Sequence, residues 1–254
     1  MVTTILSDQA LEPASSRDQQ EIDNFSAQAA SWWDSSGPFA PLHRLNPTRI
    51  RILANLFAAH FSRSLDKTDP FSGLSLTDVG CGGGLVTEPF ARLGFDIVGL
   101  DASAENIATA RNHAETSGLK IDYRVGAPED KDAPNGPFDA VVALEVIEHV
   151  SDIKTFIDSL TEKVGPNGIL VLSTINRTLK SLALAKVAAE YILRWVPAGT
   201  HTWSKFVKPS ELTHHLRHSG FTVTAIQGMD YDLATGEWHP CDDVSVNYVL
   251  AAVR

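Results

Sequence analysis

Apolar and polar positions along this chain alternate in blocks, and the blocks change from a strand-like to a helix-like period and back. From residue 74 onward the apolar runs predict five strands in succession, at residues 74–78, 96–101, 121–125, 138–144 and 169–173. Helical patterns separate several of these strands, as at residues 104–117 and 153–164. Two closing strands are predicted at residues 221–226 and 244–253. This order predicts an α/β fold with a Rossmann-like, doubly wound sheet of seven strands.

The chain before this alternating region has a different pattern. Residues 1–18 are small and polar, which predicts a disordered tail. Residues 19–33 have apolar side chains at three- and four-residue spacing and predict a helix. A second helix is predicted from about residue 47 to residue 61, with Pro47 in its first turn and Asn46 as its N-cap.

One domain, residues 19–254, accounts for everything after the tail. We expect this domain to include two helical cap segments, the N-terminal cap at about residues 19–62 and a second at about residues 178–205, which is an insertion after the fifth strand. A chain of 254 residues is long enough to bury a full core in a single domain.

The turn after the first predicted strand reads DVGCGGG over residues 78–84, and Asp101 ends the second strand. In sheets that bind nucleotides, an acid at the position of Asp101 accepts hydrogen bonds from a ribose diol. Dinucleotide sites favour Gly-x-Gly-x-x-Gly/Ala, but the sixth position here is Leu85, which disfavours a nicotinamide oxidoreductase. The Gly-x-Gly-x-Gly spacing after Asp78 instead resembles the signature of class I S-adenosylmethionine (AdoMet) methyltransferases.

Composition excludes several other classes of function. A formal net charge of −10 argues against a nucleic-acid partner, because phosphate contacts require clustered Lys and Arg. The only cysteines, Cys81 and Cys241, suggest neither a disulfide framework nor a zinc site. No apolar stretch approaches the length of a membrane-spanning helix, and the N-terminus has no secretory pattern. We therefore expect a cytoplasmic protein.

Short strings outside the glycine loop carry a narrower signal: ASWWD (30–34), PLHRLNP (41–47), LEVIEHV (144–150), STINR (173–177), AEYIL (189–193) and VPAGTH (196–201). Together they resemble the ubiquinone-biosynthesis O-methyltransferase family, from about residue 20 to the C-terminus. The resemblance implies methylation of a phenolic or catechol hydroxyl on polyprenylated intermediates, namely 2-polyprenyl-6-hydroxyphenol and 3-demethylubiquinol. It also implies a ubiquinone-biosynthesis complex as a partner.

The family's cofactor contacts, transferred by this resemblance, fall on Arg49, Gly80, Asp101 and Leu144. Asp78 and Gly82 join them as parts of the loop pattern. Arg49 suits the methionine carboxylate as a charge-assisted fork, and Leu144 suits an apolar wall at the end of the fourth strand. The plainer alternatives are a solvated helix residue for Arg49 and a core residue for Leu144.

Glu145, Glu148 and His149 share one face if the segment after the fourth strand is helical. The resemblance implies that such a triad holds a divalent cation, taken as Mg²⁺. A cation chelating both catechol oxygens would stabilise the phenolate that attacks the methyl group. Alternatively, the two acids lie in the first turn of a helix, where the helix dipole stabilises negative charge.

Two histidines are candidates for the general base, His201 in the loop after the helical insertion and His43 in the N-terminal cap. Either one is equally compatible with a surface or helix-capping position.

Residues 181–196 combine a charged stripe of Lys186, Glu190 and Arg194 with apolar residues that include Tyr191 and Trp195. Such a helix suits peripheral contact with the inner face of a membrane. An ordinary surface helix is the alternative. Two rival functions also stay open, a methyltransferase for another small acceptor and a non-catalytic, membrane-docked scaffold that keeps the fold.

Overall fold

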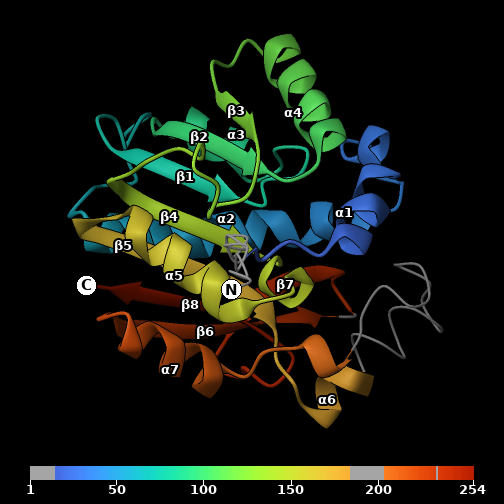
Figure 1. Cartoon of the computed structure of the whole chain (residues 1–254), viewed down its shortest axis with the longest axis vertical. Helices are drawn as coiled ribbons and strands as arrows, with labels where there is room; N and C mark the ends of the chain where they lie inside the picture. Colours follow the sequence, from blue (N-terminus) through green and yellow to red (C-terminus); the bar gives the residue numbers. More distant parts are fainter. Residues whose placement is uncertain (1–14, 184–202, 233) are drawn as a thin grey trace, which may run out of the picture.

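The computed structural model describes residues 15–183, 203–232 and 234–254 (Figure 1). Within them lies an eight-stranded sheet in the order β3-β2-β1-β4-β5-β8-β6-β7. The strands are β1 (Ser75–Val79), β2 (Asp96–Asp101), β3 (Asp122–Val125), β4 (Phe138–Leu144), β5 (Val164–Ile175), β6 (Thr222–Asp232), β7 (Glu237–Cys241) and β8 (Asn247–Val253). Strands β1 to β5 are parallel, and β8, β6 and β7 continue the sheet in antiparallel pairs. The predicted doubly wound α/β fold is confirmed.

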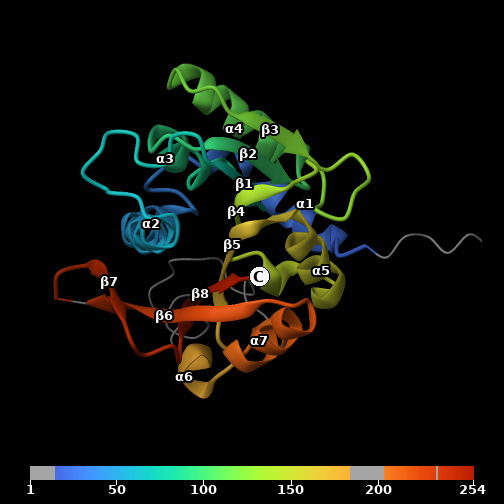
Figure 2. The same ribbon diagram turned by 90° about the vertical axis from the view of Figure 1, so that its left-hand side faces the viewer.

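Helices cover both faces of this sheet (Figure 2). They are α1 (Gln19–Ser26), α2 (Ala40–His60), α3 (Thr87–Arg92), α4 (Ala104–Thr116), α5 (Ile153–Lys163), α6 (Leu179–Ser181) and α7 (Pro209–His218). Short 3₁₀ turns are η1 (Ala29–Ser31), η2 (Ile147–His149) and η4 (Trp203–Lys205). The predicted helices at residues 104–117 and 153–164 are confirmed as α4 and α5.

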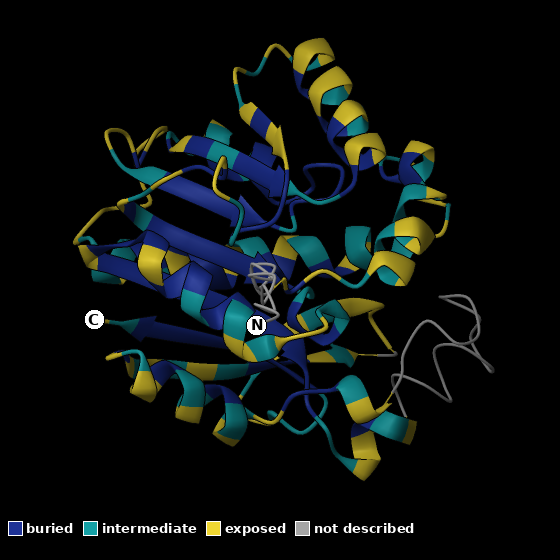
Figure 3. Cartoon of the chain, in the orientation of Figure 1, coloured by how far each residue is buried: buried dark blue, intermediate teal, exposed yellow. Residues whose placement is uncertain are grey.

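Strand β4 shows why the sheet is covered on both sides. Val141 packs in the core with α5 and α7, whereas its neighbours Ala140 and Val142 pack in a second core with α2 and α3. Successive side chains of a strand point to opposite faces, so an almost continuous apolar run serves two cores at once. Figure 3 shows the resulting buried centre between exposed helix faces.

The carboxyl ends of the parallel strands meet at one edge of the sheet, the edge on which α1 lies (Figure 1). The chain proceeds outward from β1 through β2 to β3, then crosses back to β4 on the other side of β1. Such a reversal leaves a crevice beyond the carboxyl ends of β1 and β4, where open α/β sheets bind their ligands.

The sheet differs from the predicted one at its antiparallel end. The strand predicted at residues 221–226 is the longer strand β6, which begins at Thr222 and ends at Asp232, and β7 is an eighth strand that the sequence pattern did not predict. β7 contains Pro240 and lies at the edge of the sheet, where the missing N–H of proline is tolerated. Strand β5 likewise begins at Val164 rather than residue 169, because Val164 already pairs with Phe138 of β4, and the register shifts before Ile169 pairs with Ala140.

The N-terminal helices also differ from their predicted bounds. The helix predicted at residues 19–33 ends at Ser26 and is followed by the separate turn η1. The second helix starts at Ala40 instead of residue 47, so Pro47 lies inside it and Pro41 occupies its first turn. Asn46 is therefore no N-cap, and its amide donates to the Leu85 carbonyl at 2.6 Å.

The predicted tail and insertion lie partly outside the described residues. Residues 15–18 are described, and the buried Ser16 donates to Glu129 through its backbone N–H at 2.6 Å. Of the insertion predicted at residues 178–205, the structure describes residues 178–183, including α6, and residues 203–205, which form η4. No helix within the described ranges has both the length and the apolar composition to cross a membrane.

Candidate active site

A cavity of about 560 Å³ opens at the carboxyl edge between β1 and β4. The glycine loop, the ends of β2 and β4, helices α1 and α2, and the β6–β7 hairpin all contribute to its wall. All six residues predicted to bind the cofactor line it: Arg49, Asp78, Gly80, Gly82, Asp101 and Leu144. The six residues selected from the sequence therefore lie around the same cavity in the fold.

The glycine loop requires glycine at two of these positions. Gly80 has φ +75°, and a Cβ on it would lie 2.2 Å from a methyl carbon of Val146. Gly82 has φ +54°, and its Cβ would lie 2.4 Å from the indole ring of Trp32. Any side chain would clash with Val146 or Trp32, so only glycine fits at these two positions of the cavity wall.

Asp101 lies at the end of β2, facing this loop. One oxygen of its carboxylate accepts from the Gly82 N–H at 2.9 Å. The other accepts from the Ser103 N–H at 2.9 Å and from the Asn106 amide at 3.2 Å. Burial raises the pKa of Asp101, while these three donors oppose that shift. The result is a fixed, largely buried acceptor, as a ribose diol requires.

Asp78 lies deeper, beneath the loop, and is 2% exposed. The Thr87 hydroxyl donates to it at 2.6 Å. Burial, reinforced by the charge of Asp101, raises the pKa of Asp78 to about 6. Leu144 ends β4 as both a core residue and part of the cavity wall, so the two interpretations of it hold together.

Arg49 is buried in α2 with a side chain only 5% exposed, which rules out the solvated alternative. Its closest charged partner is Glu145, with 3.4 Å between Nη2 and Oε1. Its Nε and Nη2 atoms are buried and have no hydrogen-bond partner among the described residues. A buried cation with unmet donors beside a cavity fits an incoming carboxylate. AdoMet, whose methionine part carries one, therefore suits the residues present.

The predicted triad does not share a helix face. Glu145 has φ +56°, a left-handed conformation that ends β4, and only the short turn η2 follows it. Its N–H still donates to the Ser173 carbonyl at 3.0 Å, so the pairing with β5 extends one residue past the strand. The Ser173 hydroxyl also donates to the Glu145 carboxylate at 2.7 Å.

The other two triad members have partners of their own. The buried Glu148 accepts from the Thr174 hydroxyl at 2.8 Å, and burial raises its pKa. His149 Nδ1 lies 3.2 Å from a carboxylate oxygen of Glu21 on α1. Nowhere in the described part of the chain do three acidic, histidine or cysteine side chains converge to hold a metal ion. This arrangement does not fit the predicted three-ligand site.

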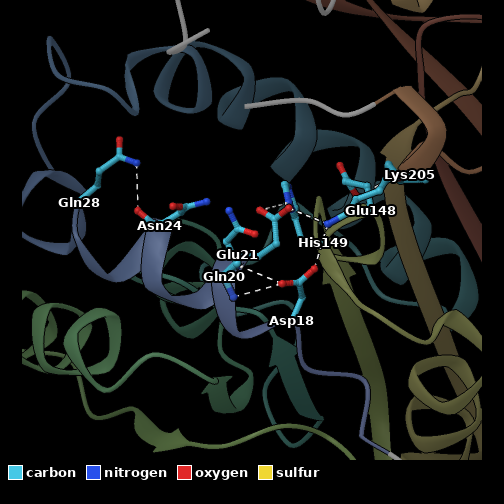
Figure 4. Close-up of polar contacts among 9 residues, drawn as sticks. Asp18, Gln20, Glu21, Asn24, Gln28, Glu148, His149 and Lys205 are labelled. Carbon is cyan, nitrogen blue, oxygen red and sulfur yellow. Dashed lines mark hydrogen bonds and ion pairs between the residues drawn. The ribbon is translucent and has the colours of Figure 1, made fainter. Parts of the chain in front are cut away.

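Glu21 and His149 belong to a bridge between α1 and the cavity floor (Figure 4). Lys205 donates to Glu21 at 2.8 Å and to Asp18 at 3.0 Å, which ties α1 to η4. The hydrogen bond with His149 lowers the pKa of Glu21. Burial lowers the pKa of His149, but the bond to Glu21 and the nearby charge of Glu148 outweigh it, so the pKa rises overall.

Unlike the predicted cofactor residues, neither of the two predicted general bases is found in the wall of this cavity among the residues that the structure describes. His43 does not line the cavity, and its Nε2 lies 2.8 Å from the Trp32 carbonyl. This contact joins α2 to the segment that carries Trp32. His201 lies outside the described residues.

Sequence reasoning missed several residues that shape the cavity. Trp32 covers the glycine loop and donates from its indole to Asn106 at 2.8 Å, across 74 positions of sequence. At the opposite end, Tyr231 and Trp238 of the β6–β7 hairpin form a tilted pair with ring centroids 5.3 Å apart. The string ASWWD drew attention to Trp32, but no local sequence pattern indicated which residues Trp32 contacts.

Comparison with known proteins agrees with this geometry. A model of the methyltransferase domain family matches residues 48–226. The "Ubiquinone biosynthesis O-methyltransferase" of Paramagnetospirillum magneticum is 48% identical over 235 residues, which are 92% of this chain and 94% of that protein. The protein of the same name from Cereibacter sphaeroides is 47% identical over 96% of this chain and 99% of its own length.

Solved structures show the same fold at low identity. The magnesium protoporphyrin IX methyltransferase of Synechocystis, with bound SAH, matches with a TM-score of 0.65 at 19% identity, over 94% of this chain and 97% of its own. A SAM-dependent methyltransferase from Thermotoga maritima matches with a TM-score of 0.63 at 12% identity, covering 92% and 98%. Together with the near relatives and the cavity, these matches show that the chain is an AdoMet-dependent methyltransferase and belongs to the ubiquinone biosynthesis O-methyltransferase family.

Proposed function

We propose that this enzyme transfers a methyl group from AdoMet to a phenolic or catechol oxygen of a polyprenylated ubiquinone precursor. The observation that carries this proposal is the two-ended cavity. Its polar end adjoins the glycine loop and Asp101, whereas its other end reaches Met229, Tyr231 and Trp238. Strands β1, β4, β5 and β8 separate the two ends, so a cofactor and an aromatic acceptor fit side by side.

At the polar end, we assign the ribose hydroxyls to Asp101 and the methionine carboxylate to Arg49. Gly80 and Gly82 allow close approach, and Leu144 provides an apolar wall. When bound, AdoMet would supply a methyl group on a cationic sulfur, so that a phenolate oxygen could attack the methyl carbon in line while the sulfur leaves as a neutral sulfide. The protein's part is to hold the acceptor oxygen near that methyl and to favour loss of its proton.

Proton removal is the step that needs a side chain. A phenol has a pKa near 10, so ionising it at pH 7 costs about 4 kcal/mol. We propose His149 as the acceptor of this proton, because it lines the cavity and Glu21 holds its Nδ1. A carboxylate on one nitrogen orients the ring and stabilises the imidazolium that forms.

Substitution tests this assignment. His149→Asn should lower kcat by about 100-fold or more, the scale of general-base catalysis, and leave the Kd of AdoMet unchanged. His43→Asn is the matched control and should keep kcat within a few-fold. A His149→Asn enzyme with normal kcat would remove His149 from the chemistry.

A divalent cation held by Glu145, Glu148 and His149 stays a prediction of the resemblance. Because each side chain has its own protein partner, we derive no step through such an ion. Activity measured after extensive chelation tests the point. Activity that survives chelation agrees with the arrangement described, and activity restored by added Mg²⁺ would show that the triad rearranges around the ion.

Peripheral membrane contact is a further part of the proposal, since a polyprenylated acceptor resides in a bilayer. The helix predicted at residues 181–196 lies outside the described residues except for residues 181–183. Leu179 and Trp203 flank that segment and are 78% and 36% exposed. Binding to vesicles that contain the prenylated acceptor should weaken in Leu179→Ser. A complex with other enzymes of the pathway is expected from the resemblance alone.

An acceptor panel tests the proposed function as a whole. Transfer from labelled AdoMet should be fastest, by kcat/KM, with a prenylated catechol, slower with unsubstituted catechol, and absent with an aromatic amine. A preference for the amine would place the enzyme with methyltransferases of another acceptor class. No transfer to any of them, with AdoMet bound, would support a scaffold instead.

A further inference from the structure

One of the contacts between the N-terminal cap and the cofactor site runs through the buried side chain of Asn106. This residue is 2% exposed and lies in the first turn of α4. Its amide oxygen accepts from the Trp32 indole at 2.8 Å, and its amide nitrogen donates to Asp101 at 3.2 Å. A chain of two hydrogen bonds thus runs from the cap to the acid at the end of β2.

The chemistry of the indole makes this chain directional. An indole N–H can only donate, so the amide must turn its oxygen toward Trp32. The amide nitrogen then necessarily faces Asp101 and donates to it. Without the indole N–H the amide oxygen loses its donor, and the bond to Asp101 alone is left to hold the amide.

Trp32 is itself held firmly in place. Its ring stacks on Phe39, with centroids 3.9 Å apart and planes within 6°. The ring also fills the space beside Gly82, and the next residue, Trp33, donates from its indole to the Gly83 carbonyl at 2.9 Å. Trp33 therefore fastens the same cap to the same loop without contacting Asn106 or Asp101 through a hydrogen bond.

We propose that Trp32 is a positioning residue for AdoMet. Its indole N–H orients the Asn106 amide, which in turn holds the Asp101 carboxylate in the position that accepts the ribose hydroxyls. The Trp32–Asn106 hydrogen bond and the binding of AdoMet are then coupled, and the coupling is reciprocal. The hydrogen bond raises affinity for AdoMet, and bound AdoMet stabilises the hydrogen bond. This inference rests on the proposed placement of the ribose at Asp101.

A double-mutant cycle tests the route of the effect. Trp32→Phe removes the indole N–H together with part of the ring that packs beside Gly82, and Asn106→Leu keeps the volume and removes the amide. Each should weaken the calorimetric affinity for AdoMet by about fivefold or more, the scale of one buried hydrogen bond. If Trp32 acts through Asn106, the double variant should bind AdoMet more tightly than the product of the two single effects predicts. Effects that multiply would overturn the proposal.

Trp33→Phe is the matched control. It removes an indole hydrogen bond from the same cap, so its effect should multiply with that of Asn106→Leu. In Trp32→Phe the KM for AdoMet should rise while kcat at saturating AdoMet stays unchanged. A fall in kcat with unchanged KM would contradict a role in positioning the cofactor site.

A measurement on the wild-type protein avoids any folding defect of the variants. S-adenosylhomocysteine should slow hydrogen exchange of the Trp32 indole N–H, assigned by its absence from the spectrum of Trp32→Phe. The Trp203 indole serves as the internal reference. Unchanged exchange at Trp32 would overturn the coupling. If Asp101→Ala binds AdoMet normally, the ribose placement fails; if it binds weakly while the cycle multiplies, only the role of Trp32 fails.

Discussion

Asp78 is buried and Asp101 is half-buried, and the different surroundings of these two acids separate their roles. Asp101 lies at the rim of the loop and accepts from three donors. Asp78 lies beneath the loop with one hydroxyl donor, from Thr87. We therefore expect Asp101 to contact the ligand and Asp78 to influence the loop that surrounds it.

Asp101→Ala should weaken the calorimetric affinity for AdoMet by about tenfold or more, because hydrogen bonds to a charged group contribute about 1.5–3 kcal/mol each. Asp122→Ala is the control, since Asp122 is an exposed acid of β3 that pairs with Arg124 of the same strand. Unchanged affinity in a folded Asp101→Ala protein would refute the ribose assignment.

Asp78 should make stability fall as the pH rises. Its pKa is about 6 in the folded protein against an ordinary 3.8, so the folded state binds the extra proton between these values. Stability from this group is complete below pH 4 and is lost as the pH rises through 6. Asp78→Asn removes that loss. The free energy of unfolding of the variant, relative to wild type, should increase from pH 4 to pH 7 and then level off. A difference that is constant with pH would contradict the burial argument.

Sequence predicted the acids and glycines at this scale because they lie on consecutive elements, where spacing alone determines which ends meet. It could not predict that Glu145 ends the strand in a left-handed conformation and that only the short turn η2 follows, so that the three side chains do not share a helix face. The backbone N–H of Glu145 still pairs with β5, and the chain turns directly after it. The contact between Trp32 and Asn106 was not predicted for another reason: it depends on tertiary packing of residues 74 positions apart in the sequence.

Among the elements, the β6–β7 hairpin is the one that distinguishes this sheet from the predicted seven strands. The Thr48 hydroxyl of α2 donates to the Trp238 carbonyl at 2.6 Å and so ties the hairpin beside Arg49. Met229 and Trp238 belong to, or pack against, the core shared with α2. The hairpin therefore extends that core to the apolar end of the cavity.

Trp238→Leu should raise the KM for a prenylated catechol by about tenfold, because it removes an aromatic surface from the acceptor end. The KM for AdoMet should stay within twofold. Ile226→Ala is the matched control, as Ile226 is an exposed apolar residue of the same hairpin that does not line the cavity. A larger effect on AdoMet than on the acceptor would show that the two ends of the cavity are assigned wrongly.

Element boundaries were predicted best where strands are buried on both faces, as in β4, and worst where prolines and polar residues dominate. Pro47 was assigned to a first turn, yet Pro41 already starts the same helix. β7 was missed because an exposed edge strand leaves no apolar run in the sequence. These are the places where tertiary contacts, rather than local preference, decide the structure.

At the scale of the whole molecule, the sheet provides the fixed frame and the N-terminal segment completes the site. Helix α1 reaches the cavity floor through Glu21 and His149, and Lys205 ties the same helix to η4. The cap before α2 reaches the cofactor end through Trp32. Both contacts bring residues distant in sequence to the carboxyl edge of β1, β2 and β4, where the reaction is proposed to occur.

The most direct measurement of the central claim is methyl transfer from labelled AdoMet to a short-chain prenylated catechol, with the site of methylation determined by mass spectrometry. Wild type should place one methyl on a ring oxygen, and Asp101→Ala should require about tenfold more AdoMet for the same rate. Methylation at carbon or nitrogen, or an Asp101→Ala enzyme with the wild-type KM for AdoMet, would contradict the account.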